Sequence, residues 1–285
     1  MIKAILEKAI NRSISSLQYK AIGGGSINST YRLTVDKQTR FFCKLNEAAA
    51  FPGLFDNERK GLELLRAQQI FRIPAVIAFE NTGSSQVLIL EWIDQEITTT
   101  QCWKSFGEKL AALHQSSHPF FGLEYDNYMG ALSQSNQPSG SWTDFFIGQR
   151  LVPQVKMGVE KHLLEKEDAG HFERLYKKIA DAFPPEPPSL VHGDLWSGNF
   201  LCDTCQEPAL LDPAVYFGHR AVDLGMTTLF GGFDREFYEA YRYHSILPPN
   251  HPEQWTLCNL YPLLIHLNLF GLSYRSRIRE IIRPY

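Results

Sequence analysis

Residues 192–199 read His-Gly-Asp-Leu-Trp-Ser-Gly-Asn, and this octet is the most informative stretch of the chain. It places the carboxylate of Asp194 five positions before the amide of Asn199, and a second acid, Asp212, follows within the apolar stretch 209–213. Phosphoryl transfer from a nucleotide needs one acid to accept a hydroxyl proton, and further oxygen groups to hold the metal that neutralises phosphate charge. The octet therefore predicts a phosphotransferase with Asp194 as catalytic base, and with Asn199 and Asp212 as Mg²⁺ ligands.

Protein kinases have the same spacing between aspartate and asparagine, in the order His-Arg-Asp-x-x-x-x-Asn. Here Gly193 occupies the arginine position, which argues against an ordinary protein kinase and favours a relative that phosphorylates small molecules. A single Asp or Asn is most often a turn or capping residue. Three such residues at this spacing are hard to explain as caps. We interpret His192 as structural, fixing the loop by hydrogen bonds.

A glycine-rich turn and a lysine on a strand precede the octet. The turn contains Gly23, Gly24, Gly25 and Ser26, and its backbone N–H groups can approach phosphate because glycine has no Cβ. Lys44 follows three apolar residues and needs a partner for its charge. We expect it to bind nucleotide phosphates, oriented by Glu58 on the next helix. The alternatives are an ordinary hairpin turn and a surface lysine at a strand end.

The strand over 87–91 reads Val-Leu-Ile-Leu-Glu and runs into Trp92 and Ile93, just before the composition changes. In a two-lobed kinase this is the hinge, where backbone groups bind adenine. We therefore predict that Glu91, Trp92 and Ile93 contact the nucleotide through their backbone. A core strand that runs into a linker is compatible with the same pattern.

The predicted elements indicate an α+β, two-lobed, protein-kinase-like fold with a small antiparallel-sheet N-lobe and a mainly helical C-lobe. We place a nucleotide-binding lobe at 1–97 and a helical catalytic and substrate lobe at 98–285. Apolar periodicity and turn signals predict the following elements: helices over 1–17, 54–70, 98–117, 142–164 and 168–183, strands over 18–22, 30–35, 40–45, 74–79 and 87–91, a surface loop over 119–141, a hairpin over 200–202 and 209–211, and further helices after 222.

Composition narrows the class of protein. The 285 residues are 44% hydrophobic with a formal net charge of -3, so nothing favours nucleic-acid or membrane binding. No apolar run is long enough to span a bilayer. Glu7 and Lys8 stand where a secretory signal would be apolar. Five irregularly spaced cysteines favour a reducing cytoplasm over a disulfide framework. Nothing in the sequence specifies an oligomeric state.

Three polar residues and a cysteine pair follow the octet. Asp223 could cap the next helix or brace the octet, and we favour bracing. His219 and Arg220 could be structural or could face substrate. Residues 202–205 read Cys-Asp-Thr-Cys and resemble half a zinc knuckle. Without a second pair, we expect an ordinary hairpin turn there.

These segments resemble the fructosamine kinase (ketosamine 3-kinase) family along essentially the whole chain. The octet carries the resemblance together with residues 212–224 and 229–233, with 23–28 and 57–58 in the small lobe, and with 268–271 near the end. Trp196 is specific, since choline kinases and aminoglycoside phosphotransferases share the Asp and Asn but differ around them. Trp196 is therefore also a candidate substrate residue.

The resemblance implies ATP and Mg²⁺, and phosphorylation of the sugar 3-hydroxyl of ketosamines, either fructosamines or ribulosamines, on small amines or on proteins. The phosphorylated adduct then decomposes, so the activity would be protein deglycation and repair. Some family members carry a redox-active cysteine where this chain has Ser26, so a thiol switch is not expected. The alternatives are a kinase of choline, an aminoglycoside or a similar small molecule, and a nucleotide-binding regulatory pseudokinase. The presence of Asp194, Asn199 and Asp212 disfavours a pseudokinase.

Overall fold

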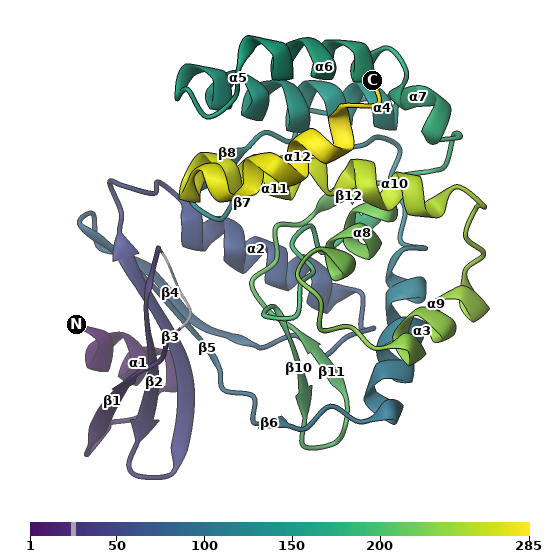
Figure 1. Ribbon diagram of the computed structural model, residues 1–285. Coiled ribbons are helices and arrows are strands. Elements are labelled where there is room, and N and C mark those ends of the chain that lie inside the picture. Colours follow the sequence, from purple (N-terminus) through teal and green to yellow (C-terminus); the bar gives the residue numbers. More distant parts are fainter. Residues whose placement is uncertain (24–26) are drawn as a thin grey trace. The chain divides into compact units, whose positions relative to one another are not determined.

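A five-stranded antiparallel sheet forms most of the first part of the chain (Figure 1). The computed structural model describes residues 1–23 and 27–285. The spatial order of the strands is β1-β2-β3-β5-β4. Their bounds are Leu17–Ala21 for β1, Ser29–Val35 for β2, Thr39–Glu47 for β3, Val76–Asn81 for β4 and Ser85–Glu91 for β5.

The two faces of this sheet pack against different helices. Helix α1 (Ile2–Ile10) buries Leu6 against a core that includes Leu33 and Cys43. Side chains alternate across a strand, so Lys44 points to the opposite face from Cys43. That face meets helix α2 (Leu54–Ala67), which packs against β4 and β5. The alternation therefore directs Lys44 toward α2, the helix that carries Glu58.

The chain forms two units by its internal contacts. Residues 1–99 and 201–213 form one, and residues 100–200 and 214–285 form the other. The first unit includes the hairpin formed by β10 (Phe200–Asp203) and β11 (Pro208–Leu210), and the short strand β6 (Gln95–Glu96) pairs with β10. The assignment of nucleotide-binding and catalytic lobes to 1–97 and 98–285 stays a prediction.

Helices make up most of the second unit. Helix α3 (Thr100–Leu113) packs against α9 (Arg235–His244), and the approach is so close that a Cβ on Gly107 would lie 2.2 Å from the backbone oxygen of Phe237. The other α-helices are α4 (Trp142–Phe145), α5 (Val152–Glu160), α6 (Lys166–Tyr176), α7 (Ile179–Ala182), α8 (Ala221–Leu229), α10 (His251–Cys258), α11 (Leu260–Phe270) and α12 (Arg275–Ile282).

The predicted fold class is confirmed, and several element boundaries are corrected. The first helix ends at Ile10 instead of residue 17, because Asn11 adopts the left-handed conformation with φ 51°. The helix expected over 142–164 is interrupted by a π-helical segment, Phe146–Leu151, and α5 ends at Glu160. Within the expected loop 119–141, two short strands form a hairpin: β7 (Asn127–Met129) and β8 (Leu132–Gln134).

Candidate active site

The loop that carries Asp194 follows strand β9 (Ser189–Val191), which pairs with β12 (Tyr216–Gly218). Gly193 adopts φ +81°, and a Cβ there would lie 2.2 Å from the backbone oxygen of Ala214. Glycine is therefore required both by the left-handed conformation and by the close approach of the two backbone segments. The turn that this glycine allows leads directly into Asp194, which is half-buried.

Asp223 braces this loop from helix α8. Its carboxylate accepts hydrogen bonds from the backbone N–H groups of His192 (2.8 Å) and Gly193 (2.9 Å). The Nε2 atom of His114 lies 3.2 Å from the same carboxylate, and its Nδ1 atom lies 2.9 Å from the hydroxyl of Tyr241. The bracing role expected for Asp223 is confirmed. His192 is itself buried and accepts from the backbone N–H of Asp194 at 3.3 Å, as expected for a structural residue.

The side chain of Asn199 is hydrogen-bonded to Asp194 within the loop. Its Nδ2 atom donates to the backbone oxygen of Asp194 at 2.9 Å and to the carboxylate Oδ2 at 2.8 Å. Both N–H bonds of the amide are used in this way, so its Oδ1 atom is the part available to another group. An amide oxygen is a hard ligand of the kind that Mg²⁺ prefers. The structure therefore joins Asp194 and Asn199 and orients the amide.

Lys44 is buried between two carboxylates in the first unit. Its Nζ atom lies 2.9 Å from Glu58 and 2.5 Å from Asp212. Burial lowers the pKa of Lys44, but the charges of Asp212 and Glu58 raise that pKa by more, so the lysine stays protonated. Burial also raises the pKa of Glu58, against the opposing charge of Lys44. The sequence predicts the pairing with Glu58, whereas the contact with Asp212 depends on the tertiary fold.

Asp212 has an unusual backbone conformation. Its φ is +50°, in a left-handed region that non-glycine residues adopt uncommonly and that Asp and Asn tolerate best. Strained backbone of this kind is concentrated at functional sites. The side chain of Asp212 is 45% exposed despite its contact with Lys44. The carboxylate is thus held at a defined position and remains accessible.

The side chains at the predicted hinge make local contacts. Glu91 accepts from Arg72 at 2.7 Å and from the backbone N–H of Ala75 at 3.1 Å. The indole of Trp92 donates to Asp94 at 3.0 Å, and Ile93 is buried. These contacts occupy the side chains, so any nucleotide contact here would use the backbone, as expected. That role stays a prediction.

The glycine-rich turn is only partly described. Gly23 lies in an exposed bend, with open space where a Cβ would be. The predicted phosphate-loop residues Gly24, Gly25 and Ser26 lie outside the described residues. Their role as phosphate-binding groups stays a prediction.

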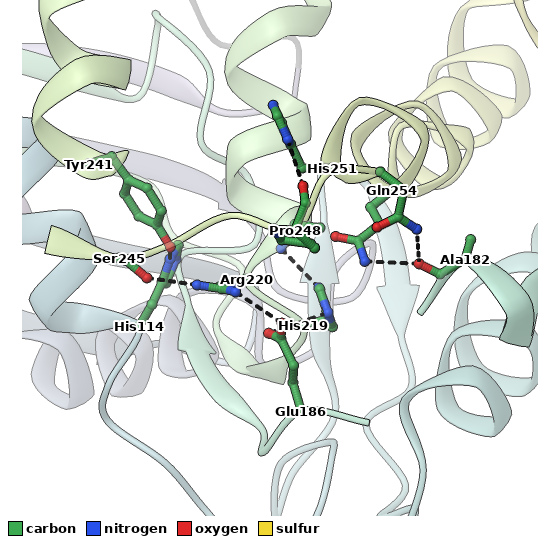
Figure 2. Close-up of polar contacts among 12 residues, drawn as sticks. His114, Ala182, Glu186, His219, Arg220, Tyr241, Ser245, Pro248, His251 and Gln254 are labelled. Atoms are coloured by element: carbon green, nitrogen blue, oxygen red, sulfur yellow. Dashed lines mark hydrogen bonds and ion pairs between the residues drawn. The ribbon is translucent and has the colours of Figure 1, made fainter. Parts of the chain in front are cut away.

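His219 and Arg220 lie in a polar cluster of the second unit (Figure 2). Arg220 donates to Ser245 at 2.6 Å and to Glu186 at 2.9 Å. His219 is buried, with its Nε2 atom 3.6 Å from Glu186. Burial lowers the pKa of His219 to about 3. These contacts favour the structural alternative over the substrate-facing one for both residues.

Comparison with known proteins gives the family. The family model described as fructosamine kinase matches residues 1–285. The chain belongs to the fructosamine kinase family. It is 39% identical over 267 residues to a Synechocystis protein named "probable ketoamine kinase", covering 93% of this chain and 88% of the relative. It is 34% identical over 275 residues to the chloroplastic protein-ribulosamine 3-kinase of Arabidopsis thaliana, covering 93% and 81% of the two chains.

A solved structure of the same family has the same fold. The crystal structure of the "putative fructosamine-3-kinase" from Thermobifida fusca superposes with a TM-score of 0.90 at 29% identity, and the match covers 99% of this chain and 97% of that one. Across residues 1–23 and 27–285, no helix is long and apolar enough to cross a membrane.

Trp196 of the octet is partly exposed and lies two positions after Asp194. Its side chain is 37% exposed, and its ring meets that of Phe230 edge to face, with centroids 6.1 Å apart. A Cβ on Gly198 would lie 2.2 Å from the Trp196 ring, so the second glycine of the octet makes room for the indole. The ring of His266 lies 4.9 Å from Phe230 and continues this aromatic surface. Trp196 stays a candidate substrate residue in this fructosamine kinase family member.

Several contributors to the site were not predicted from the sequence. His114 and Tyr241 lie far from the octet in the chain, and only the packing of α3 and α9 brings them to Asp223. None of the five cysteines, all of which lie within the described residues, forms a disulfide bond. No group of three potential metal-ligating His, Cys, Asp or Glu residues occurs among the described residues. Residues 202–205 form part of the β10–β11 hairpin, as expected for a simple turn.

Proposed function

We propose that this chain is an ATP-dependent kinase that transfers the γ-phosphoryl group to the sugar 3-hydroxyl of ketosamines. The observation that carries the proposal is the geometry around Asp194 in a member of this family. Asn199 holds the carboxylate of Asp194, and Asp223 holds the backbone that precedes it. Pre-organised positioning of this kind supplies most of the rate enhancement in phosphoryl transfer.

The acceptor class is supported by the names of the relatives. The cyanobacterial relative is named for ketoamines and the plant relative for protein-bound ribulosamines. We extend this class to the present chain as fructosamines and ribulosamines, on small amines or on protein lysines. The phosphorylated adduct would then decompose and release the unmodified amine, so the cellular role is deglycation. We place the protein in the cytoplasm, and its substrates require neither a nucleic acid nor a membrane.

Asp194 is the proposed catalytic base. In a loose phosphoryl-transfer transition state the attacking hydroxyl loses its proton late, so the base must chiefly hold the hydroxyl in position. The carboxylate of Asp194 is half-buried and already oriented by Asn199. It can therefore accept a hydrogen bond from the sugar hydroxyl and then take the proton.

Lys44 is the proposed ligand of the nucleotide phosphates, with Glu58 as the residue that orients it. The lysine is protonated and buried against Glu58 at 2.9 Å. The pairing with Glu58 would keep the charge of Lys44 compensated if Asp212 also held a metal ion. We assign phosphate contacts to residues 23–26 and adenine contacts to the backbone of 91–93.

The donor groups of Asn199 and Asp212 fit Mg²⁺. The Oδ1 atom of Asn199 is the part of the amide available to another group, and the carboxylate of Asp212 is 45% exposed. Both are hard oxygen ligands, and Mg²⁺ binds proteins through a few such ligands together with substrate phosphates. When bound, the ion would neutralise negative charge on the phosphates.

The test is an assay of ADP release from purified protein. The acceptors are a ribulosamine, a fructosamine, choline and an aminoglycoside, each at several concentrations with Mg-ATP. We expect turnover with the two ketosamines and a phosphate on the sugar 3-oxygen, located by ³¹P and ¹³C NMR. Asp194→Asn should abolish most of this turnover, and the exposed Asp181→Asn serves as the matched control.

Two outcomes would reject the proposed activity, and a third would reject the proposed role of Asp194. Preferential turnover of choline or the aminoglycoside would assign the chain to another small-molecule kinase class. ATP binding without turnover, insensitive to Asp194→Asn, would indicate a regulatory nucleotide-binding protein. Turnover of ketosamines that Asp194→Asn leaves unchanged would remove Asp194 from the catalytic role.

A further inference from the structure

A cavity of about 310 Å³ lies in the second unit, between helices α8, α10 and α11 and the segment 273–281. This segment comprises the end of a 3-10 helix (Leu272–Tyr274) and most of α12. The volume is at the lower end of the range for small-molecule sites. None of the residues given a catalytic or nucleotide-binding role above lines this cavity.

The cavity adjoins the aromatic surface formed by Trp196, Phe230 and His266. Phe230 lines the cavity and also contacts the ring of Trp196, two residues after Asp194. Tyr274 lines it as well, and its ring lies 5.0 Å from that of His266, which in turn contacts Phe230. Trp196 and Phe230 therefore connect the octet to this cavity through side-chain contacts.

Hydrogen-bond donors gather on one side of the cavity. Ser273, Tyr274 and Arg277 line it from the same short segment. Arg277 is the one charged side chain of the lining, which lies wholly within the described residues. It pairs with Glu280 at 2.8 Å, but both side chains are more than half exposed, at 63% and 59%. Such an exposed pair is weak, and a guanidinium has five N–H donors, so Arg277 can bind a second anion.

Helices α8 and α10 contribute hydrogen-bond acceptors to the lining. Thr228 donates its hydroxyl hydrogen to the backbone oxygen of Gly225 at 2.7 Å, and Thr256 donates to Pro252 at 2.8 Å. With their hydrogens used in this way, both hydroxyl oxygens can act only as acceptors, and that of Thr228 already accepts one hydrogen bond, from Asn259 Nδ2 at 3.3 Å. A ligand that carries an anionic group and an amine at the same end matches this division of the lining.

We propose that this cavity binds the amino-acid end of a ketosamine acceptor, with Arg277 recognising a free carboxylate. A ketosamine on the side-chain amine of free lysine has its α-carboxylate and α-amine at the far end of a four-carbon chain from the sugar. The carboxylate lies against Arg277, Ser273 and Tyr274, and the amine donates toward Thr228 and Thr256. The inference rests on the proposed function, and it makes low-molecular-weight amino-acid adducts the preferred substrates over protein-bound ones.

The test compares two acceptors that differ only at the carboxylate. One is the ribulosyl adduct on the side-chain amine of lysine with a free α-carboxylate, and the other is its α-carboxamide. For the unmodified enzyme we expect a KM about tenfold lower for the free acid, as a partly exposed charge-assisted contact provides. Arg277→Met should raise the KM for the acid to that of the amide and leave kcat unchanged, whereas Arg277→Lys should restore part of the preference.

Matched controls separate this inference from the proposed function. Arg283→Met changes an exposed arginine of the same region outside the cavity and should keep the preference. Glu280→Gln removes the competing carboxylate and should lower the KM for the acid or leave it unchanged. Equal KM values for both acceptors in the unmodified enzyme, or a preference that survives Arg277→Met, would overturn the inference while the kinase activity stands. No phosphorylation of either acceptor would remove the proposed function, and this inference with it.

Discussion

Replacing Asp223 with asparagine should destabilise the octet loop and slow the reaction without touching the substrate. The Asp223 side chain is fully buried, with 0% of its surface exposed. One carboxylate oxygen accepts from Gly193, and the other accepts from His192 and lies beside His114. Asparagine keeps the shape of the side chain but turns one of these two acceptors into a donor. At least one backbone N–H group of the loop then loses its partner and faces another donor.

The expected losses of stability and of kcat follow from these contacts. A hydrogen bond to a charged group contributes about 1.5–3 kcal/mol, and a buried donor left without a partner costs about 1–3 kcal/mol. Some relaxation of the loop reduces the total, so we expect the free energy of unfolding to fall by roughly 2–4 kcal/mol. Because a displacement of about 1 Å at a reacting group can cost about 100-fold in rate, kcat should fall by about that factor.

Three measurements check this prediction. Urea titration gives the change in unfolding free energy, amide hydrogen exchange reports protection at His192 and Gly193, and ADP release gives kcat. The exposed Asp181→Asn is the control for the chemical change alone. If Asp223→Asn left the free energy of unfolding within about 0.5 kcal/mol, with both amides still protected and kcat within about twofold, Asp223 would not be the residue that holds the octet loop.

Three further predictions address nucleotide use, the octet tryptophan and pH. Lys44→Ala should raise the KM for ATP by about tenfold or more, whereas Asp194→Ala should chiefly lower kcat, by about 100-fold or more. Equal KM increases in both variants would contradict this division of roles. Gly198→Ala should displace the Trp196 ring, because the added Cβ would lie 2.2 Å from it. The acceptor KM should then rise about tenfold with a changed tryptophan fluorescence, and an unchanged acceptor KM would remove Trp196 from the acceptor site. Burial lowers the pKa of His219 to about 3, so below its ordinary value near 6.5 the unfolded chain binds a proton that the folded chain does not. The free energy of unfolding should therefore fall as the pH drops from about 6.5, by roughly 2 kcal/mol from this group at pH 5. Urea titrations of His219→Gln should show a shallower pH slope, and a slope equal to that of the unmodified protein would contradict the assignment.

The sheet of the first unit was predictable from local patterns, because residues 30–35 alternate, residues 87–90 form an apolar run, and glycine or polar residues separate the strands. The helix boundaries were less predictable. Residues 11–16 continue a polar and apolar pattern that is compatible with a helix, but Asn11 takes the left-handed conformation and ends α1 at Ile10. Strand β12 could not be found from periodicity, since three residues show no repeat. It exists because Tyr216–Gly218 pairs with β9.

The octet itself was evident in the sequence, because the spacing of an aspartate and an asparagine within one loop is a local property. The residues that hold the octet loop in place were only partly evident from the sequence. Asp223 stands close enough along the chain to be recognised as a brace, whereas His114 is 109 residues away from it. The contact between Lys44 and Asp212 spans 168 residues. Such partners depend on tertiary packing, which a single sequence does not report.

Two aspartates near one loop have opposite surroundings, and this difference separates their roles. Asp223 is fully buried and accepts two backbone N–H groups and approaches a histidine, so its carboxylate serves the loop and cannot reach a substrate. Asp194 is half-buried, and Asn199 holds one of its oxygens from the side. Gly193 links the two aspartates. Only glycine permits the left-handed turn at this position. In this turn the N–H of Gly193 donates to Asp223, and the next residue, Asp194, remains partly exposed. A base that must position a hydroxyl needs both properties together, a rigid backbone and an accessible carboxylate, and the octet obtains them from two different aspartates.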